Sequence, residues 1–425
     1  MIRSSRAWRT AAVLGVSALA LSACGGDEPN PTTDEPSESA AAGGGEGDGE
    51  LVIGTLLPQT GSLAFLGPPE FAGVQLAIDD INAAGGVLGK DVVKVDSDSG
   101  DTSTDIASQS VDRLISQDVD AIVGAASSGV SMTVIDKITG GGIVHFSPAN
   151  TSPDFTDYED NGLYFRTAPS DVLQGRVMGD LLINDGFLSV GVIALDDPYG
   201  TGLAENIKLS LEGGGGEIAG GDAIIYDPKA SSFSAEVTQL KGADPEAIVL
   251  VGFEETKKIV PELQAQGIGP DQVPLYFVDG NLADYSDSFQ PGTLEGVKGT
   301  LPGAEAGEEF QAQLLEVDPS LKDFSYAPES YDATVLIALA AIAAGDDSGE
   351  AIGEALPDVS RGGEKCTTFA DCSEMLEAGT DIDYDGVSGP IEFSDAGDPT
   401  QATIGIYEYG AENTYTNVEY VSGEL

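Results

Sequence analysis

Positively charged residues are scarce in this chain of 425 residues. There are 18 Lys and Arg against 72 Asp and Glu, which gives a formal net charge of −54 at pH 7. Such a surface repels polyanions, so nucleic acid is excluded as a partner and electrostatic docking onto anionic lipid is disfavoured. The acidity does not indicate disorder, because 41% of the residues are hydrophobic and they recur periodically from residue 51 onward.

Histidine and cysteine are almost absent. The only histidine is His145, and the three cysteines are Cys24, Cys366 and Cys372. A His-rich metal centre and a reaction with several His-based steps are therefore excluded by count. No cofactor is indicated either. The glycine run at 213–216 follows an expected helix and precedes an expected strand, which is the reverse of the order in a dinucleotide-binding loop.

The first 24 residues are typical of an export signal with a lipidation site. Three arginines precede a short apolar stretch over 11–20, which is too short for a membrane span of about 20 residues. The ending Leu21-Ser22-Ala23-Cys24 resembles the cleavage box of bacterial lipoproteins, in which the cysteine receives a diacylglycerol. We expect residues 1–23 to be removed as a signal peptide and Cys24 to be lipidated. An ordinary secretion signal with a chance cysteine is the alternative.

Residues 24–50 are expected to form a lipid-anchored, flexible, acidic tether. From Gly25 to Glu50 there are seven Gly, three Pro and eight acidic residues, and no apolar residue larger than Ala. This composition cannot bury enough apolar surface to offset the chain entropy lost on folding. The lipid alone would hold the protein on the membrane, by burying its methylene groups.

The other two cysteines lie close together in the segment EKCTTFADC. In an exported protein, Cys366 and Cys372 are expected to form a local disulfide. A metal site is disfavoured at this segment, because no further Cys or His lies nearby in the sequence.

From residue 51 the chain alternates short apolar strands with segments of helical periodicity. Repeated β-α-β units of this kind require parallel sheets that helices cover on both faces. Two series of units, separated near FRTAPS (165–170), predict an α/β fold with two doubly wound parallel-sheet lobes. The apolar segment 331–345 is predicted to be a buried core helix rather than a membrane span. The expected strands are 51–57, 92–97, 121–124, 143–146, 189–195, 221–226, 247–252 and 275–278, and the expected helices run through 71–81, 104–117, 129–139, 171–184, 199–211, 233–241 and 254–266.

Polar loops follow several of these strands, at the sheet edge where ligands of open parallel sheets bind. In the first lobe, the loops at 125–129 and 147–153 offer small hydroxyl residues and helix N-termini, which suit a carboxylate without requiring Arg. In the second lobe, the Asp279 carboxylate can pair with an ammonium group, and Tyr199 and Phe253 can form an apolar wall. Together these loops predict a cleft for a small zwitterion.

Eight segments also occur in the order and spacing of a known family: TGSLAFLGPPEFAGVQLAIDDINAAGGVLGK, VGAASSGVS, FSPANTSPDFT, FRTAPSDVLQG, DDPYGTG, YFVDGNLADY, LEGVKGTLPG and DYDGVSGPIEFSDAGD. They resemble the type I periplasmic-binding-protein solute receptors of ABC importers, in particular the leucine/isoleucine/valine-binding branch. The resemblance covers residues 51–425. It implies a monomeric, non-enzymatic receptor outside the cytoplasm that captures a small solute and delivers it to an ABC permease.

The resemblance also implies a set of ligand contacts and a ligand class. A branched-chain or other aliphatic amino acid is expected; a short amide, urea or an aromatic acid is the alternative, as is a role in sensing. Leu66 stands where the branched-chain receptors place an aromatic residue, and Asp279 where they carry a glutamate. The implied contacts are Ser127 and Thr151 to the carboxylate and amine, the backbone of Asn150, Tyr199 and Phe253 closing from the second lobe, and Asp279 to the ammonium.

The resemblance further predicts two lobes joined by three hinge crossings. The first lobe is expected to comprise 51–168 and 301–397, and the second 169–300 and 398–425. In this mechanism the open receptor binds the solute on lobe 1, and lobe 2 then swings in to form the state that a permease recognises.

Two other readings are weaker. DIDYDGVSGPIE has the spacing of a calcium loop through Asp381, Asp383, Asp385 and Glu392, but it leads into an expected strand and not a helix, which favours an acidic turn. A serine hydrolase at Ser127 would need a base, and the sole histidine lies inside an apolar strand and is expected to belong to the core.

Overall fold

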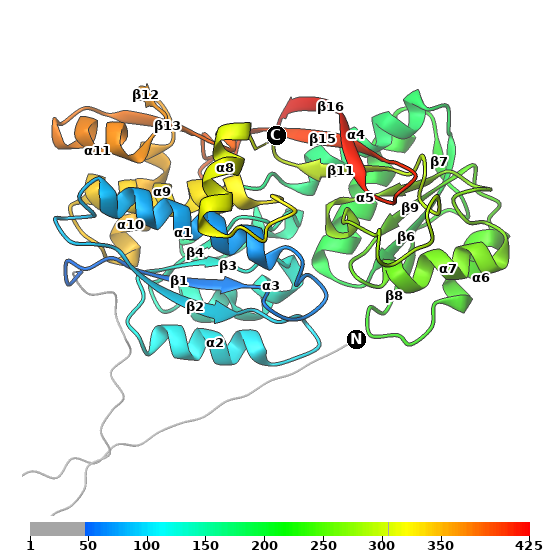
Figure 1. Cartoon of the computed structure of the whole chain (residues 1–425), viewed down its shortest axis with the longest axis horizontal. Helices are drawn as coiled ribbons and strands as arrows, with labels where there is room; N and C mark the ends of the chain where they lie inside the picture. Colours follow the sequence, from blue (N-terminus) through cyan, green and yellow to red (C-terminus); the bar gives the residue numbers. More distant parts are fainter. Residues whose placement is uncertain (1–46, 305) are drawn as a thin grey trace, which may run out of the picture. The chain divides into compact units, whose positions relative to one another are not determined.

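The computed structural model describes residues 47–304 and 306–425 (Figure 1). The expected signal peptide, the lipidation site at Cys24 and most of the expected tether lie outside the described residues. These expectations therefore stay predictions.

The first sheet has five parallel strands in the order β2-β1-β3-β4-β5. Helix α1 lies on one side of this sheet and α2 on the other, as the doubly wound pattern requires (Figure 1). The elements of this part are β1 (Val52–Leu57), α1 (Gly67–Ala83), β2 (Val93–Asp98), α2 (Ile106–Ile115), β3 (Ala121–Gly124), α3 (Ser128–Thr139), β4 (Val144–Ser147), the 3-10 turn η1 (Pro153–Phe155) and β5 (Tyr164–Arg166).

The second sheet has eight strands in the order β16-β15-β11-β10-β9-β6-β7, and β8 pairs with β6. Its strands from β6 to β11 run parallel. The elements are α4 (Asp171–Asn184), β6 (Ser189–Leu195), α5 (Pro198–Gly213), β7 (Glu217–Ile218), β8 (Ile224–Tyr226), α6 (Ser234–Gly242), β9 (Ala247–Val251), α7 (Thr256–Gln266), β10 (Leu275–Phe277), the 3-10 turn η2 (Asp279–Asn281) and β11 (Lys298–Pro302).

The C-terminal hairpin adds an antiparallel part to the parallel sheet of the second lobe. Strands β15 (Gln401–Tyr409) and β16 (Tyr415–Glu424) are antiparallel, and β15 pairs with β11. An antiparallel hairpin needs only a short turn, whereas each parallel strand needs a crossover. The strand expected at 221–226 is also shorter than predicted, because Gly220 and Gly221 have positive φ and separate β7 from β8.

The chain returns to the first lobe between β11 and β15. The long helix α9 packs there against α1, α10 and α11. Every residue from Ala327 to Ala341 is buried, which confirms a core helix, although within the described residues α9 is long and apolar enough to span a membrane. The other elements are α8 (Glu308–Val317), α9 (Ala327–Ala344), α10 (Gly349–Val359), β12 (Glu364–Cys366), α11 (Phe369–Glu377), β13 (Ile382–Gly386) and β14 (Gly389–Pro390).

The chain thus passes between the two sheets three times: between β5 and α4, after β11, and before β15. The two-lobed α/β fold with a three-crossing hinge is therefore confirmed, with the C-terminal hairpin as its mixed part. The residue limits expected for each lobe stay a prediction. The disulfide between Cys366 and Cys372 is confirmed and joins β12 to α11.

Candidate functional site

A small cavity lies where the carboxyl ends of strands from both sheets meet. Six of the seven residues expected to bind the ligand line it, and Asn150 lies behind its wall. The space open to water centres is about 10 Å³, roughly that of one water molecule. The lining residues are Leu63, Leu66, Ala126, Ser127, Ser128, Ala149, Thr151, Tyr199, Phe253, Asp279, Gly280 and Tyr326.

Ser127 reaches the cavity because it caps the N-terminus of α3. Its Oγ accepts a hydrogen bond from the Val130 N–H at 3.3 Å, so the hydroxyl lies over the free amides of the first turn. Those amides and the helix dipole favour a negative group in front of them. This end of the cavity can therefore hold a carboxylate.

The side chain of Asn150 joins two loops beside the cavity. Its side-chain amide donates to the carbonyl oxygens of Ala125 at 3.0 Å and Ala126 at 2.9 Å, which ties the loop after β4 to the loop after β3. Its own carbonyl oxygen accepts from Arg166 at 3.3 Å. The neighbouring Thr151 hydroxyl is buried and has no hydrogen-bond partner among the described residues.

Asp279 also lines the cavity and is the centre of a polar cluster. Its Oδ1 accepts from the Tyr199 hydroxyl at 2.7 Å and the Gln174 amide at 2.9 Å, and its Oδ2 accepts from the Tyr326 hydroxyl at 2.8 Å. Burial raises the pKa of the Asp279 carboxyl above its usual value, and the hydrogen bonds from these donors oppose that rise.

A second carboxylate, Asp171, lies close to this cluster and was not predicted as a site residue. Its backbone N–H donates to the Thr151 carbonyl at 2.7 Å, and neither side-chain oxygen has a partner with hydrogen-bond geometry among the described residues. Burial and the charge of Asp279 raise the pKa of Asp171 well above its usual value. The nearby Thr151 hydroxyl and the charge of Arg166 act in the opposite direction.

Gln174 and Tyr326 were also missed. Gln174 lies one helical turn beyond Asp171 in α4 and donates to both Asp279 and the Thr300 hydroxyl, so it links α4 to β11. Tyr326 precedes α9 with a left-handed backbone, φ 60°, and this turn sends its hydroxyl to Asp279. The only feature of the sequence that could have pointed to Asp171 and Gln174 is their position. They lie at the start of an expected helix, directly after a hinge crossing.

Aromatic and aliphatic side chains form the remaining walls. The rings of Tyr199 and Phe253 are stacked, with centroids 5.4 Å apart and planes 7° apart. Leu63 and Leu66 face them from the loop before α1. This arrangement suits an apolar side chain of moderate size.

A larger chamber of about 600 Å³ opens from this cavity and shares Ser127 and Phe253 with it. Lys229 bridges it, because its Nζ donates to the Thr102 carbonyl at 3.0 Å. Asp197 and Glu255 also line the chamber, and burial raises their pKa values to about 6 and about 7.

The sequence profile of the family described as "Periplasmic binding protein" matches residues 50–412. The chain is a member of the periplasmic binding protein family. Among curated relatives, Leu/Ile/Val-binding protein homolog 1 of Brucella abortus (strain 2308) is 25% identical over 386 residues, which cover 88% of this receptor and 95% of that protein. The chemotactic signal transduction system substrate-binding protein BasB of Halobacterium salinarum is 27% identical over 366 residues, covering 82% and 84%.

A third relative, Leu/Ile/Val-binding protein homolog 3 of Brucella melitensis, is 32% identical over 208 residues. That match covers 48% of this receptor and 55% of the relative, so it spans about half of each protein. The resemblance of the sequence to the leucine/isoleucine/valine-binding branch is confirmed by these relatives.

Solved structures share the fold. The leucine binding protein LivK from Thermotoga maritima superposes with a TM-score of 0.71 at 20% identity, covering 87% of this receptor and 98% of that chain. LivJ from Streptococcus pneumoniae, in complex with isoleucine, gives 0.70 at 23% identity over 88% and 100%. A solute binding protein from R. palustris, in complex with benzoate, gives 0.69 at 20% identity over 89% and 98%.

The chain is thus a binding protein by its family, and the relatives named above are binding proteins rather than enzymes by their names. A hydrolytic triad is not assembled among the described residues, where no hydrogen bond joins His145 to Ser127 or Ser128. His145 is fully buried in β4, against the edge of Tyr164, and burial lowers its pKa to about 3.

The segment considered for calcium forms a strand. Asp383 and Asp385 lie on β13, and Lys365 Nζ lies 3.5 Å and 2.7 Å from their carboxylates. Within the described residues, no group of three or more His, Cys, Asp or Glu side chains could hold a metal ion. The ammonium group of Lys365 therefore occupies the position next to these carboxylates that a cation would need. Asp381 and Glu392 flank this segment without joining the pair.

Proposed function

We propose that this receptor captures an α-amino acid with an aliphatic side chain in the small cavity and presents it to an ABC permease. The observation that carries the proposal is the buried Asp171 carboxyl beside Asp279, for which the Thr151 hydroxyl is the only nearby side-chain donor and forms no hydrogen bond of standard geometry within the described residues. A buried charge without a partner is costly, and an ammonium group supplies both the charge and the donors that this region lacks.

The other two parts of an amino acid have matching surfaces in this proposal. The carboxylate is held at Ser127 and the first turn of α3, which needs no positively charged side chain. The side chain packs against Leu63, Leu66 and Phe253. Leucine, isoleucine and valine each have an ammonium group, a carboxylate and an apolar side chain, which match these three surfaces.

Binding requires the two sides of the cleft to part first, because about 10 Å³ of space holds no amino acid. Hydrogen bonds now join the two sides: Ser152 Oγ donates to the Pro198 carbonyl at 3.0 Å, and Tyr326 donates to Asp279 at 2.8 Å. Together with the Lys229–Thr102 hydrogen bond, these are individual bonds that hinge motion can break and remake.

The pH dependence of binding tests the ammonium assignment. The pKa values of Asp171 and Asp279 are raised, and an ammonium group that pairs with them lowers both. Binding therefore releases protons, and affinity rises with pH. Isothermal titration calorimetry with leucine, isoleucine and valine, in buffers of different ionisation enthalpy, measures both effects. Absence of binding by every aliphatic amino acid would refute the proposed ligand class.

An aromatic acid is the second candidate, and the benzoate-bound neighbour and the Tyr199–Phe253 wall favour it. A ligand without an ammonium group leaves both carboxylates unpaired, so it binds best when they are protonated. The affinity for an aromatic acid therefore falls as pH rises, whereas the affinity for an amino acid rises. Benzoate and 4-hydroxybenzoate in the same titrations distinguish the two classes.

The place and partner of the receptor complete the proposal. Lipidation at Cys24 would tether it to the membrane, and Cys24→Ser should release it into the medium in a cell-fractionation assay. BasB belongs to a chemotactic system, which supports ligand sensing as an alternative to transport. Uptake of radiolabelled ligand by cells with and without the receptor separates the two roles.

A further inference from the structure

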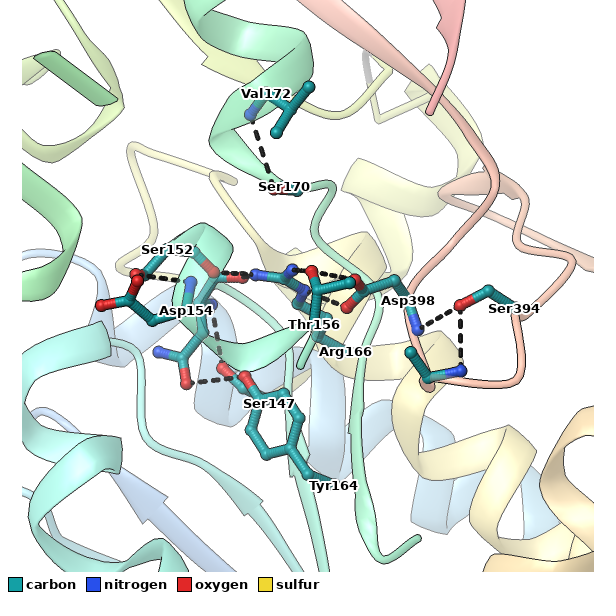
Figure 2. Close-up of polar contacts among 12 residues, drawn as sticks. Ser147, Ser152, Asp154, Thr156, Tyr164, Arg166, Ser170, Val172, Ser394 and Asp398 are labelled. Atoms are coloured by element: carbon teal, nitrogen blue, oxygen red, sulfur yellow. Dashed lines mark hydrogen bonds and ion pairs between the residues drawn. The ribbon is translucent and has the colours of Figure 1, made fainter. Parts of the chain in front are cut away.

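Arg166 lies between the loop that carries Thr151 and the third hinge crossing (Figure 2). Toward the loop, its Nη1 donates to the Ser152 carbonyl at 2.7 Å and the Asn150 carbonyl at 3.3 Å. These two carbonyls flank Thr151, so one guanidinium group fixes the backbone on both sides of that residue.

Toward the hinge, Arg166 contacts the segment before β15. Its Nε donates to Asp398 Oδ1 at 2.6 Å, and its backbone N–H donates to the Gly397 carbonyl at 3.1 Å. The Thr156 hydroxyl completes the arrangement, because it accepts from Arg166 Nη2 at 3.2 Å and donates to Asp398 Oδ2 at 2.6 Å. Ser394 holds the same segment through its hydrogen bonds with the Asp398 backbone.

This connection is buried away from solvent. Arg166 is 0% exposed, so salt does not screen its pair with Asp398 as it screens a surface pair. Burial alone would lower the pKa of Arg166, but the charge of Asp398 and the groups around it raise the pKa above its usual value. The guanidinium plane also lies over the Phe155 ring, 5.8 Å from its centroid.

The same loop also contacts the second lobe. Ser152 Oγ donates to the Pro198 carbonyl at the start of α5, and the Pro153 ring packs against Gly202. A displacement of the third crossing therefore reaches the Thr151 loop through Arg166, and a displacement of α5 reaches it through Ser152.

We infer that Arg166 is a positioning residue that couples the third hinge crossing to the ligand-binding loop. It does not line the cavity. With Asp398 it sets where Thr151 lies as the hinge closes, and so it sets ligand affinity from a distance. This role rests on the proposed function, because Thr151 must contact the ligand for its position to matter.

The test compares two arginine–aspartate pairs on the same segment. Arg361 also binds this crossing, through the Phe393 carbonyl at 2.6 Å and Asp395 at 3.0 Å, but Asp395 is almost fully exposed and the pair does not reach the ligand loop. Arg166→Lys, Asp398→Asn and the milder Thr156→Val are compared with Arg361→Lys in the full-length chain. Ile352→Val, in the core of α10, controls for lost stability alone.

Calorimetry gives Kd for the amino acid that binds the wild type best, at a temperature where each variant is folded. Small-angle scattering gives the contraction on ligand addition. We expect Arg166→Lys and Asp398→Asn to weaken binding about 10-fold and to reduce the contraction, since a small misplacement of a contact group has a large effect. Arg361→Lys and Ile352→Val should leave Kd within about twofold of the wild type.

Unchanged Kd and contraction in all three variants of the buried network would overturn the inference. Thr156→Val keeps the test decisive if the charge variants do not fold, because it removes only one hydroxyl. A wild type that binds no amino acid refutes the proposed function instead, so the two failures are distinguishable.

Discussion

The neighbouring buried carboxyls of Asp279, which lines the cavity, and Asp171, which lies behind it, have different surroundings. Asp279 accepts hydrogen bonds from Tyr199, Gln174 and Tyr326. Asp171 is also buried, yet only the nearby Thr151 hydroxyl and the charge of Arg166 favour its ionised form. In the proposed function, the fold supplies hydrogen bonds to Asp279 and the ligand supplies the missing donors to Asp171. A binding protein needs this difference, because a site satisfied in every part would gain little from its solute.

Asp279→Asn should have the largest effect on binding. It removes the charge proposed to pair with the ammonium group, and it replaces one of the two oxygens that accept from Tyr199 and Tyr326 with an amide NH2 group. We expect amino-acid affinity to fall about 100-fold or more and the free energy of unfolding to fall by about 1–3 kcal/mol. Calorimetry and chemical denaturation measure the two quantities. Undiminished affinity would remove Asp279 from the site.

Asp171→Asn should separate binding from stability. The variant loses an ammonium partner, so affinity should fall about 10-fold or more. It also removes a carboxyl whose ionised form is disfavoured by burial, so the free energy of unfolding at pH 8 should rise by about 1 kcal/mol or more. A rise in the free energy of unfolding for Asp171→Asn and a fall for Asp279→Asn would establish the contrast between the two carboxylates. A loss of stability in both variants would contradict it.

The pH dependence of stability sharpens the same contrast. The folded-state pKa of Asp171 lies above its unfolded value of about 3.9. The folded protein therefore binds more protons, and the free energy of unfolding decreases as pH rises from about 4 through the raised pKa. Glu255 and Glu329, with pKa values of about 7 and about 8, act with the same sign. Melting temperature should fall between pH 5 and pH 8 in the wild type, and less steeply in Asp171→Asn; parallel curves would contradict the assignment.

Tyr326→Phe and Tyr199→Phe should have the smallest effects. Each variant removes one hydroxyl donor to Asp279, so the pKa of that carboxyl rises further and affinity at pH 7 falls about 3- to 10-fold. Affinity should recover at higher pH, because the carboxylate is then ionised again. Titrations at several pH values measure the recovery; a loss independent of pH would mean that the hydroxyls act through packing.

The sequence predicted most elements of the two lobes, because their periodicity is local. The strands at 121–124 and 189–195 and the helix at 171–184 have the predicted limits. The short strands β5, β7 and β11, the helices α8, α10 and α11, and every strand from β12 to the C-terminal hairpin were not predicted. β5 has three residues, too few for a periodicity, and β15 is fixed mainly by its pairing with β11.

The sequence predicted most of the residues that line the candidate site, but not which of their side chains contact one another. Six expected residues line one cavity because strand ends of parallel sheets converge. Asp171 was placed only as the start of a helix, since nothing local reveals that its carboxylate is buried beside Asp279. The Arg166–Asp398 pair joins residues 232 positions apart, and no spacing rule connects them.

Sequence alone thus determined what short-range patterns can specify: two series of β-α-β units, an acidic chain that avoids polyanions, a local disulfide, and the family to which these segments belong. Tertiary structure decided that Asp279 has three side-chain donors, that Asp171 has fewer, and that Arg166 contacts both the segment before β15 and the loop that carries Thr151. The physical reason is desolvation. The energy of a buried charge depends on every group packed around it, and those groups come from distant parts of the chain.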